Sequence, residues 1–195
     1  MRNLHFNPWH WILTAAFFLL LAGVWNPSAG IEEMAALLAA SYLLARVAFF
    51  PLKRYVFNKA VMFDMGGVVT QGDFYTEVLT EMPGTRELVE RLKVHYKVAM
   101  LTNNNALGFK PFDSKFGFSQ LFDEVIVSGQ EGVKKPDEKI FHIALRKLNV
   151  SAKNAYFLDD TPANVDAAKA LSIHGIVFKD AKQAEADLKK AGLKF

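Results

Sequence analysis

The sequence predicts an α/β fold, a doubly wound parallel sheet, preceded by a hydrophobic α-helical hairpin. From Lys59 onward, short apolar runs alternate with segments of helical periodicity, as is typical of a parallel sheet covered on both faces. Before Lys59 the sequence has only six charged side chains, whereas the rest carries 19 basic and 18 acidic ones. We therefore divide the chain into residues 1–58, the hairpin, and residues 59–195, the α/β domain.

The first region contains two apolar segments joined by a turn. Segment 9–25, WHWILTAAFFLLLAGVW, has no charged residue and has tryptophans at both ends, where membrane interfaces favour aromatic rings. Segment 34–50 is apolar except for Arg46, and both segments have the shortest length that spans a bilayer. We expect a transmembrane hairpin that anchors the chain. The alternatives are a signal peptide ending near residues 28–30, and a hairpin that packs on the α/β domain or lies at a membrane interface.

Charges around the two segments predict their orientation. Basic residues lie toward the outer ends of the pair, namely Arg2 at one end and Arg46, Lys53 and Arg54 at the other, whereas the turn carries the acidic Glu32 and Glu33. Because short cytoplasmic flanks carry an excess of Lys and Arg, both chain ends and the α/β domain are expected on the cytoplasmic side of the membrane.

Five apolar runs in the second region predict buried strands, at residues 60–63, 98–101, 125–127, 155–158 and 175–178. Helical patterns lie between them. We expect Thr85, Asp137 and Thr161 to be N-caps, with Pro162 in the first turn after Thr161, and a last helix over residues 181–191. The carboxyl ends of such strands are where ligands bind in open parallel sheets.

Polar residues gather at those ends. They are Asp64 after the first strand, Thr102 and Asn103 after the second, Asp159 and Asp160 after the fourth, and Lys135 in the loop before Asp137. Clustered carboxylates repel one another unless a cation and a lysine compensate, and oxygen ligands without His or Cys suit Mg²⁺. A carboxylate can attack phosphorus while a hydroxyl, an amide and an ammonium group bind the phosphoryl oxygens. The pattern therefore predicts a phosphoryl pocket with Mg²⁺ as its cofactor.

Four motifs in this order resemble the haloacid dehalogenase-like (HAD) hydrolase superfamily, over the whole of the second region. They are VMFDMGGVV, LTNN, GVKKPDEKIF and FLDDTPAN. The resemblance implies that Asp64 is a nucleophile that forms an aspartyl-phosphate. Thr102 and Asn103 would bind the transferring phosphoryl group together with Gly67. Lys135 would neutralise the nucleophile and the phosphate.

The resemblance also implies a set of metal ligands. Asp160 would hold Mg²⁺ together with Asp64 and the backbone carbonyl of Gly66, and Asp159 would bind it directly or through water. Asn164 would orient the site from the following helix.

The chain departs from the family pattern at Gly66, where phosphatases usually carry a second aspartate. That aspartate acts as general acid and base, a role worth roughly 10²- to 10⁴-fold in rate. Asp73 in the next loop is a candidate to replace this acid. The alternative is that Asp73 is an ordinary solvated carboxylate with no role in the reaction. We expect Gly66 to permit the tight turn after Asp64.

A second departure is the absence of a helical cap. Only residues 71–82 separate the first motif from the next helix, whereas many relatives insert several dozen residues there. The pocket is therefore expected to be open to large substrates, or to a partner that covers it.

Composition narrows the choice of partners. The net charge is +3 and the charges after residue 58 nearly balance, with no basic stripe interleaved with aromatic residues. We therefore expect no nucleic-acid partner. The absence of cysteine excludes disulfides, thiolate zinc sites and cysteine nucleophiles.

Taken together, these patterns predict a membrane-anchored, Mg²⁺-dependent phosphohydrolase that faces the cytoplasm and acts on a phosphomonoester or an acyl phosphate. The substrate would be a phosphorylated small molecule, a lipid head group or a protein. The alternative is a catalytically impaired module that binds Mg²⁺ or a phosphorylated ligand. A dehalogenase is a weaker third reading, because those enzymes also lack the second aspartate but close their pocket with the cap.

Overall fold

The computed structural model describes residues 57–72, 79–105 and 107–195. The predicted hairpin, apart from its last two residues, and Asp73 lie outside the described residues. No helix in the described part of the chain has the length and apolar character needed to cross a membrane.

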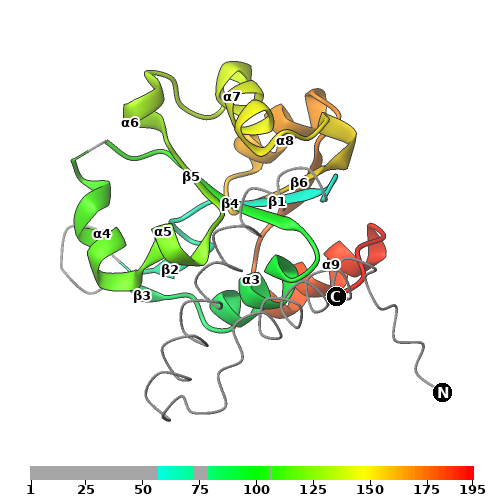
Figure 1. Cartoon of the computed structure of the whole chain (residues 1–195), viewed down its shortest axis with the longest axis horizontal. Coiled ribbons are helices and arrows are strands. Elements are labelled where there is room, and N and C mark those ends of the chain that lie inside the picture. The colour runs from blue at the N-terminus through cyan, green and yellow to red at the C-terminus, as the bar shows by residue number, and fades with distance from the viewer. Residues whose placement is uncertain (1–56, 73–78, 106) are drawn as a thin grey trace, which may run out of the picture. The chain divides into compact units, whose positions relative to one another are not determined.

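A five-stranded sheet in the order β5-β4-β1-β6-β7 forms the centre of this part of the chain (Figure 1). Its strands are β1 (Ala60–Phe63), β4 (Lys97–Thr102), β5 (Glu124–Val127), β6 (Ala155–Asp159) and β7 (His174–Val177). All neighbouring pairs are parallel, and β1 lies between β4 and β6. The five predicted strands and the α/β class are thereby confirmed, and the carboxyl ends of β4, β1 and β6 lie side by side.

Helices cover both faces of the sheet. In Figure 1, α3 (Thr85–Lys93) and α9 (Ala181–Lys190) lie below it, and α7 (Glu138–Leu148) and α8 (Pro162–Ala170) lie above it. Shorter elements connect the layers: α4 (Phe109–Phe116), α5 (Phe118–Leu121), α6 (Ser128–Glu131) and the 3₁₀ helix η1 (Ala152–Asn154). This two-sided covering is the predicted doubly wound arrangement.

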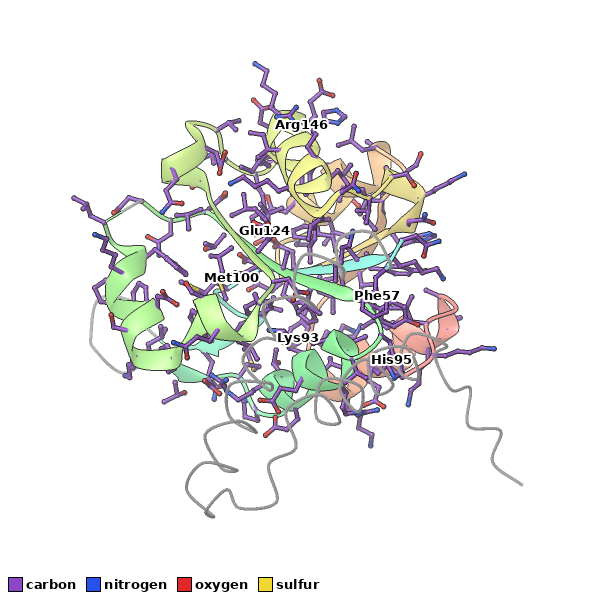
Figure 2. All side chains as sticks on the ribbon, in the orientation of Figure 1. Phe57, Lys93, His95, Met100, Glu124 and Arg146 are labelled. Atoms are coloured by element: carbon purple, nitrogen blue, oxygen red, sulfur yellow. The ribbon has the colours of Figure 1, made fainter. Side chains whose placement is uncertain are left out.

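The sheet is buried on both faces, which explains why its strands are apolar without alternation. Val61 and Phe63 pack in the cluster on the side of α3 and α9, whereas Ala60 and Met62 pack in the cluster on the side of α7. Figure 2 shows Arg146 extending outward from α7, away from this interior. The central strand β1 is therefore fixed from both sides, and so is the residue that follows it.

The N-cap residues of two helices agree with the prediction, and the N-cap residue of a third does not. Asp137 caps α7 through its side chain, and Thr161 is the N-cap residue of α8. The N-cap of α3 is Gly84, so the prediction of Thr85 is wrong. The Thr85 hydroxyl instead donates to the Val68 carbonyl at 2.9 Å, a bond that fastens α3 to the loop after β1.

A small hairpin, which the sequence did not predict, follows that loop. Strands β2 (Thr70–Gln71) and β3 (Thr80–Glu81) pair in antiparallel fashion. Arg86 at the start of α3 forms an ion pair with Glu81, and its Nη2 donates to the Phe116 carbonyl at 2.7 Å. These contacts join the hairpin to α3 and α4 beside the site.

Candidate active site

Asp64 follows the central strand directly. Its backbone N–H donates to the Leu158 carbonyl at 2.8 Å, which continues the pairing of β1 with β6 by one residue. Its side chain is 14% exposed and lies at the carboxyl edge of the sheet. The carboxylate is thus held at the bottom of a site that remains open to solvent.

Lys135 joins two carboxylates from neighbouring strands. Its Nζ lies 2.7 Å from Asp64 Oδ1 and 2.7 Å from Asp159 Oδ2. The lysine side chain is 1% exposed, and the ammonium group lies 5.3 Å from the centroid of the Phe157 ring. A charge buried this deeply needs paired partners, and these two carboxylates provide them.

Asp159 is fully buried, and both of its oxygens are occupied. Its Oδ1 accepts from the Thr161 N–H at 2.8 Å and from Asn164 Nδ2 at 3.1 Å. Its Oδ2 accepts from Lys135 at 2.7 Å and from Asn164 at 3.1 Å. Asn164 therefore orients Asp159, and Asp159 orients Lys135.

Asp160 differs from its neighbour because it is exposed. Its carboxylate leans against the loop after β1, since a Cβ placed on Gly67 would lie 2.0 Å from Asp160 Oδ2. The Thr161 hydroxyl lies 3.3 Å from Asp160 Oδ1. Of the two acids at the end of β6, Asp160 is thus the one with oxygens available at the site.

The loop after Asp64 turns tightly, but not at the glycine that we predicted. The left-handed residue is Gly67, with φ of 74°, whereas Gly66 is not among the glycines with positive φ. The Gly67 N–H donates to the Thr70 carbonyl at 2.7 Å, and the Met65 carbonyl accepts from the Thr70 N–H at 2.8 Å. Gly67 therefore adopts the left-handed conformation that the turn requires, and its lack of a side chain leaves room for the Asp160 carboxylate. The prediction that the turn depends on Gly66 is wrong.

A cavity of about 500 Å³ opens beside Asp64. Thr102 at the end of β4 lines it, although the whole residue is only 3% exposed. Asn103 also lines it, but its side chain is bonded to the backbone of Lys135 in both directions at 2.9 Å. The structure thus brings Asp64, Thr102 and Asn103 together at the cavity, and the Asn103 side chain bonds to the backbone of Lys135.

Five further residues line this cavity that were not predicted as site residues, namely Met65, Asn104, Asn105, Gly108 and Phe112. The run of three asparagines after Thr102 was the available signal. Asn104 is anchored through its carbonyl, which accepts from the Ser128 hydroxyl at 3.0 Å, and Asn105 accepts from the Gly108 N–H. These bonds shape the loop between β4 and α4 into one wall of the cavity.

Three carboxylates lie close together at the site, and the pKa of one of them is raised. One carboxylate oxygen from each of Asp64, Asp159 and Asp160 can be chosen so that all three lie within 4.8 Å of one another. Burial raises the pKa of Asp64 to about 6, with the nearby Asp159 charge adding to the rise and Lys135 opposing it. The arrangement therefore offers a carboxylate that is ionised at neutral pH and a group of hard oxygen donors beside it.

Comparisons with known proteins found similar sequences and similar folds. The model of one family, described as haloacid dehalogenase-like hydrolase, matches residues 74–172, which is about half of the chain. The glyceraldehyde 3-phosphate phosphatase of Pyrococcus furiosus is 32% identical over 124 residues, covering 63% of this chain and 52% of the relative. The phosphorylated carbohydrates phosphatase of Thermotoga maritima is 29% identical over 103 residues, covering 52% and 48%. This chain thus spans about half the length of these curated relatives.

Solved structures share the fold. A HAD family enzyme of Bacteroides thetaiotaomicron, in complex with magnesium and inorganic phosphate, superimposes with a TM-score of 0.55 at 18% identity. The match covers 63% of this chain and 94% of that one.

Proposed function

We propose a phosphohydrolase function, from the premise that the chain belongs to the haloacid dehalogenase-like hydrolase family. The family predicted from the four motifs is thereby confirmed. The observation that carries the proposal is the position of Asp64, whose ionisable carboxylate faces a cavity of about 500 Å³ with Lys135 2.7 Å behind it.

The proposed reaction has two steps. The Asp64 carboxylate attacks phosphorus, the bond from phosphorus to the leaving oxygen breaks, and the enzyme carries an aspartyl-phosphate. Water then attacks phosphorus, which releases inorganic phosphate and restores the carboxylate. The Lys135 ammonium group and the Thr102 hydroxyl compensate the negative charge that develops on the phosphoryl oxygens.

The donor set at the site fits Mg²⁺, the cation bound in solved structures of a HAD family enzyme with the same fold. Asp64, Asp160 and the Gly66 carbonyl are the groups that would hold it, because oxygen donors suit a small hard cation. Asp159 acts instead through Lys135, since both of its oxygens already accept hydrogen bonds. When bound, the ion would neutralise charge on Asp64 and on the phosphoryl oxygens.

Gly66 sets the range of leaving groups. With no carboxylic acid at this position, the departing oxygen takes its proton from water, so acyl and aryl phosphates should react faster than alkyl phosphates. The same glycine favours a second candidate function, a binding module for Mg²⁺ or a phosphorylated ligand, because the remainder of the site is intact.

The substrate that we propose is a phosphorylated small molecule. Two of the curated relatives are phosphatases of glyceraldehyde 3-phosphate and of phosphorylated carbohydrates, which makes these compounds the first to test. The short segment between β1 and α3 supports an open site without a helical cap. Lipid head groups and phosphoproteins, and a partner that covers the site, remain proposals to be tested with the same assay.

The test is phosphate release from acetyl phosphate, an aryl phosphate and glyceraldehyde 3-phosphate by the full chain, with and without Mg²⁺, beside Asp64→Asn. Mg²⁺-dependent release that is lost in the variant supports the phosphohydrolase. If no compound is hydrolysed while Mg²⁺ and phosphate still raise the thermal midpoint, the binding module replaces it.

We also propose that residues 1–58 anchor the chain to a membrane with the α/β domain in the cytoplasm. The support is the pair of apolar segments and their flanking charges. Washing membranes with alkaline carbonate tests the anchor, because an integral hairpin stays with the membrane. Release of the chain into the wash would contradict it.

A further inference from the structure

Asn103 and Lys135 form a two-way bond between a side chain and a backbone. The Lys135 N–H donates to Asn103 Oδ1 at 2.9 Å, and Asn103 Nδ2 donates to the Lys135 carbonyl at 2.9 Å. Both backbone groups of Lys135 are therefore satisfied by one amide. This pair of bonds ties the loop before α7, which carries Lys135, to the end of β4.

The amide side chain of Asn103 is suited to this pair. It presents a donor and an acceptor side by side, whereas a carboxylate only accepts and a methyl group does neither. The neighbouring asparagines use their amides differently. Asn104 Oδ1 accepts from the Asn105 N–H at 2.8 Å, and Asn105 accepts from Gly108, so both bonds stay within their own loop. Asn103 alone in this run reaches another segment through its side chain, among the hydrogen bonds of the described residues.

The position of the Lys135 backbone determines where its ammonium group lies. The side chain is 1% exposed and is packed along Phe157, so it cannot adjust freely if its backbone shifts. Its Nζ must reach Asp64 and Asp159 at 2.7 Å each, and a displacement of about 1 Å at a catalytic group costs up to about 100-fold in rate.

We propose that Asn103 is a positioning residue that acts through Lys135, fixing its backbone so that its ammonium group meets both carboxylates. The inference rests on the proposed phosphohydrolase function and refines the predicted role of Asn103. Because the Asn103 side chain bonds to the Lys135 backbone, the group of Asn103 that would bind a phosphoryl oxygen is its backbone N–H.

The test compares Asn103→Ala with Tyr96→Phe. Tyr96 precedes β4 at the opposite edge of the sheet and also bonds both backbone groups of one lysine, since its hydroxyl accepts from the Lys194 N–H at 2.8 Å and lies 3.2 Å from the Lys194 carbonyl. Each variant loses the hydrogen bonds of one side chain to both backbone groups of a lysine, so each should have a lower thermal midpoint than the wild type. We expect kcat/KM for acetyl phosphate to fall about 10- to 100-fold in Asn103→Ala and to stay unchanged in Tyr96→Phe.

A double-mutant cycle with Lys135→Ala separates positioning from a general loss of structure. Asn103→Ala should have no further effect on kcat/KM once the lysine side chain is absent. Equal losses in both backgrounds would overturn the proposal, because Asn103 would then act on the reaction without the lysine. Asn103→Asp keeps the acceptor for the Lys135 N–H and serves if the alanine variant does not fold.

A structural readout keeps the inference separate from the proposed function. If the wild-type chain hydrolyses nothing, the phosphohydrolase fails, and crystal structures of the wild type and Asn103→Ala still decide the positioning. Movement of Lys135 Nζ out of hydrogen-bonding distance of Asp64 or Asp159 supports it. An unmoved ammonium group overturns it.

Discussion

Asp160 occupies the space that a side chain on Gly67 would need. A Cβ at Gly67 would lie 2.0 Å from Asp160 Oδ2 and 2.6 Å from its carboxyl carbon, so the two residues fit only because Gly67 has none. The contact brings the end of β6 against the loop after β1. Gly67 thus fixes where the Asp160 carboxylate stands relative to Asp64.

Gly67→Ala should therefore abolish phosphate release. The new methyl group displaces the Asp160 carboxylate, and φ of 74° costs an alanine about 1 to 2 kcal/mol. Gly132→Ala is the matched control, because Gly132 has φ of 71° but no atom within 4 Å of a Cβ placed there. It should lose similar stability in urea titrations and keep its activity. Equal activity in the two variants would contradict the role given to Gly67.

The raised pKa of Asp64 should make the metal-free chain more stable in acid than it would be if Asp64 had its ordinary pKa. Burial raises the pKa of Asp64 from 3.8 to about 6, so the native state holds this proton more tightly than the unfolded chain does. The resulting stabilisation, about 3 kcal/mol, is fully present below pH 3.8 and is lost as the pH rises through 6.

Asp64→Asn isolates this effect, because it removes one titrating group and keeps the shape. The free energy of unfolding of the wild type minus that of the variant should be up to about 3 kcal/mol larger near pH 4 than at pH 7.5, without metal. Urea titrations at the two pH values measure it. A difference that does not change with pH would show that Asp64 titrates normally.

Removing the ammonium group of Lys135 should destabilise the chain strongly. Lys135→Met keeps the apolar stem but leaves Asp159, which is fully buried, beside Asp64 without a cation. Breaking a buried ion pair in this way costs about 3 to 5 kcal/mol.

Lys189→Met gives the comparison for an exposed pair. Lys189 lies 2.6 Å from Glu185 with its side chain 47% exposed, and such pairs contribute about 1 kcal/mol or less. Chemical unfolding of both variants at pH 7.5 checks the contrast. Similar losses would mean that the two carboxylates at the site take up protons when the lysine is removed.

The sequence allowed the sheet and its carboxyl edge to be predicted because both depend on local pattern. Runs such as Ala60 to Phe63 are apolar on both faces because the sheet is covered on both faces, and Asp64 is conspicuous because it ends such a run. The family motifs then supplied the order of the site residues along the chain.

The details that prediction missed depend on contacts between distant segments. Whether Gly66 or Gly67 takes the left-handed conformation depends on where Asp160 lies, nearly a hundred residues away. Similarly, the Asn103 side chain could be assigned to phosphate from its place in the motif, but its actual partner is the Lys135 backbone. Such choices are made by tertiary packing, which a single sequence pattern does not contain.

Gly66 gives the sharpest prediction, because a substitution there should increase activity. Gly66 lines the cavity and lies two residues after Asp64, and it is not among the glycines with positive φ, so its backbone conformation admits a side chain. Gly66→Asp should supply the missing proton donor to the leaving oxygen. Hydrolysis of alkyl phosphates such as glycerol phosphate should then rise by about 10²- to 10⁴-fold.

The substrate dependence of this gain distinguishes acid catalysis from other effects. Acetyl phosphate has a leaving group that departs without a proton, so its hydrolysis should change little in Gly66→Asp. Gly66→Asn has nearly the same shape but no acidic proton, and it should leave alkyl phosphates as slow as in the wild type. If both variants accelerated both substrates equally, the new side chain would be acting on the shape of the pocket, and the missing acid would not be what limits the natural chain.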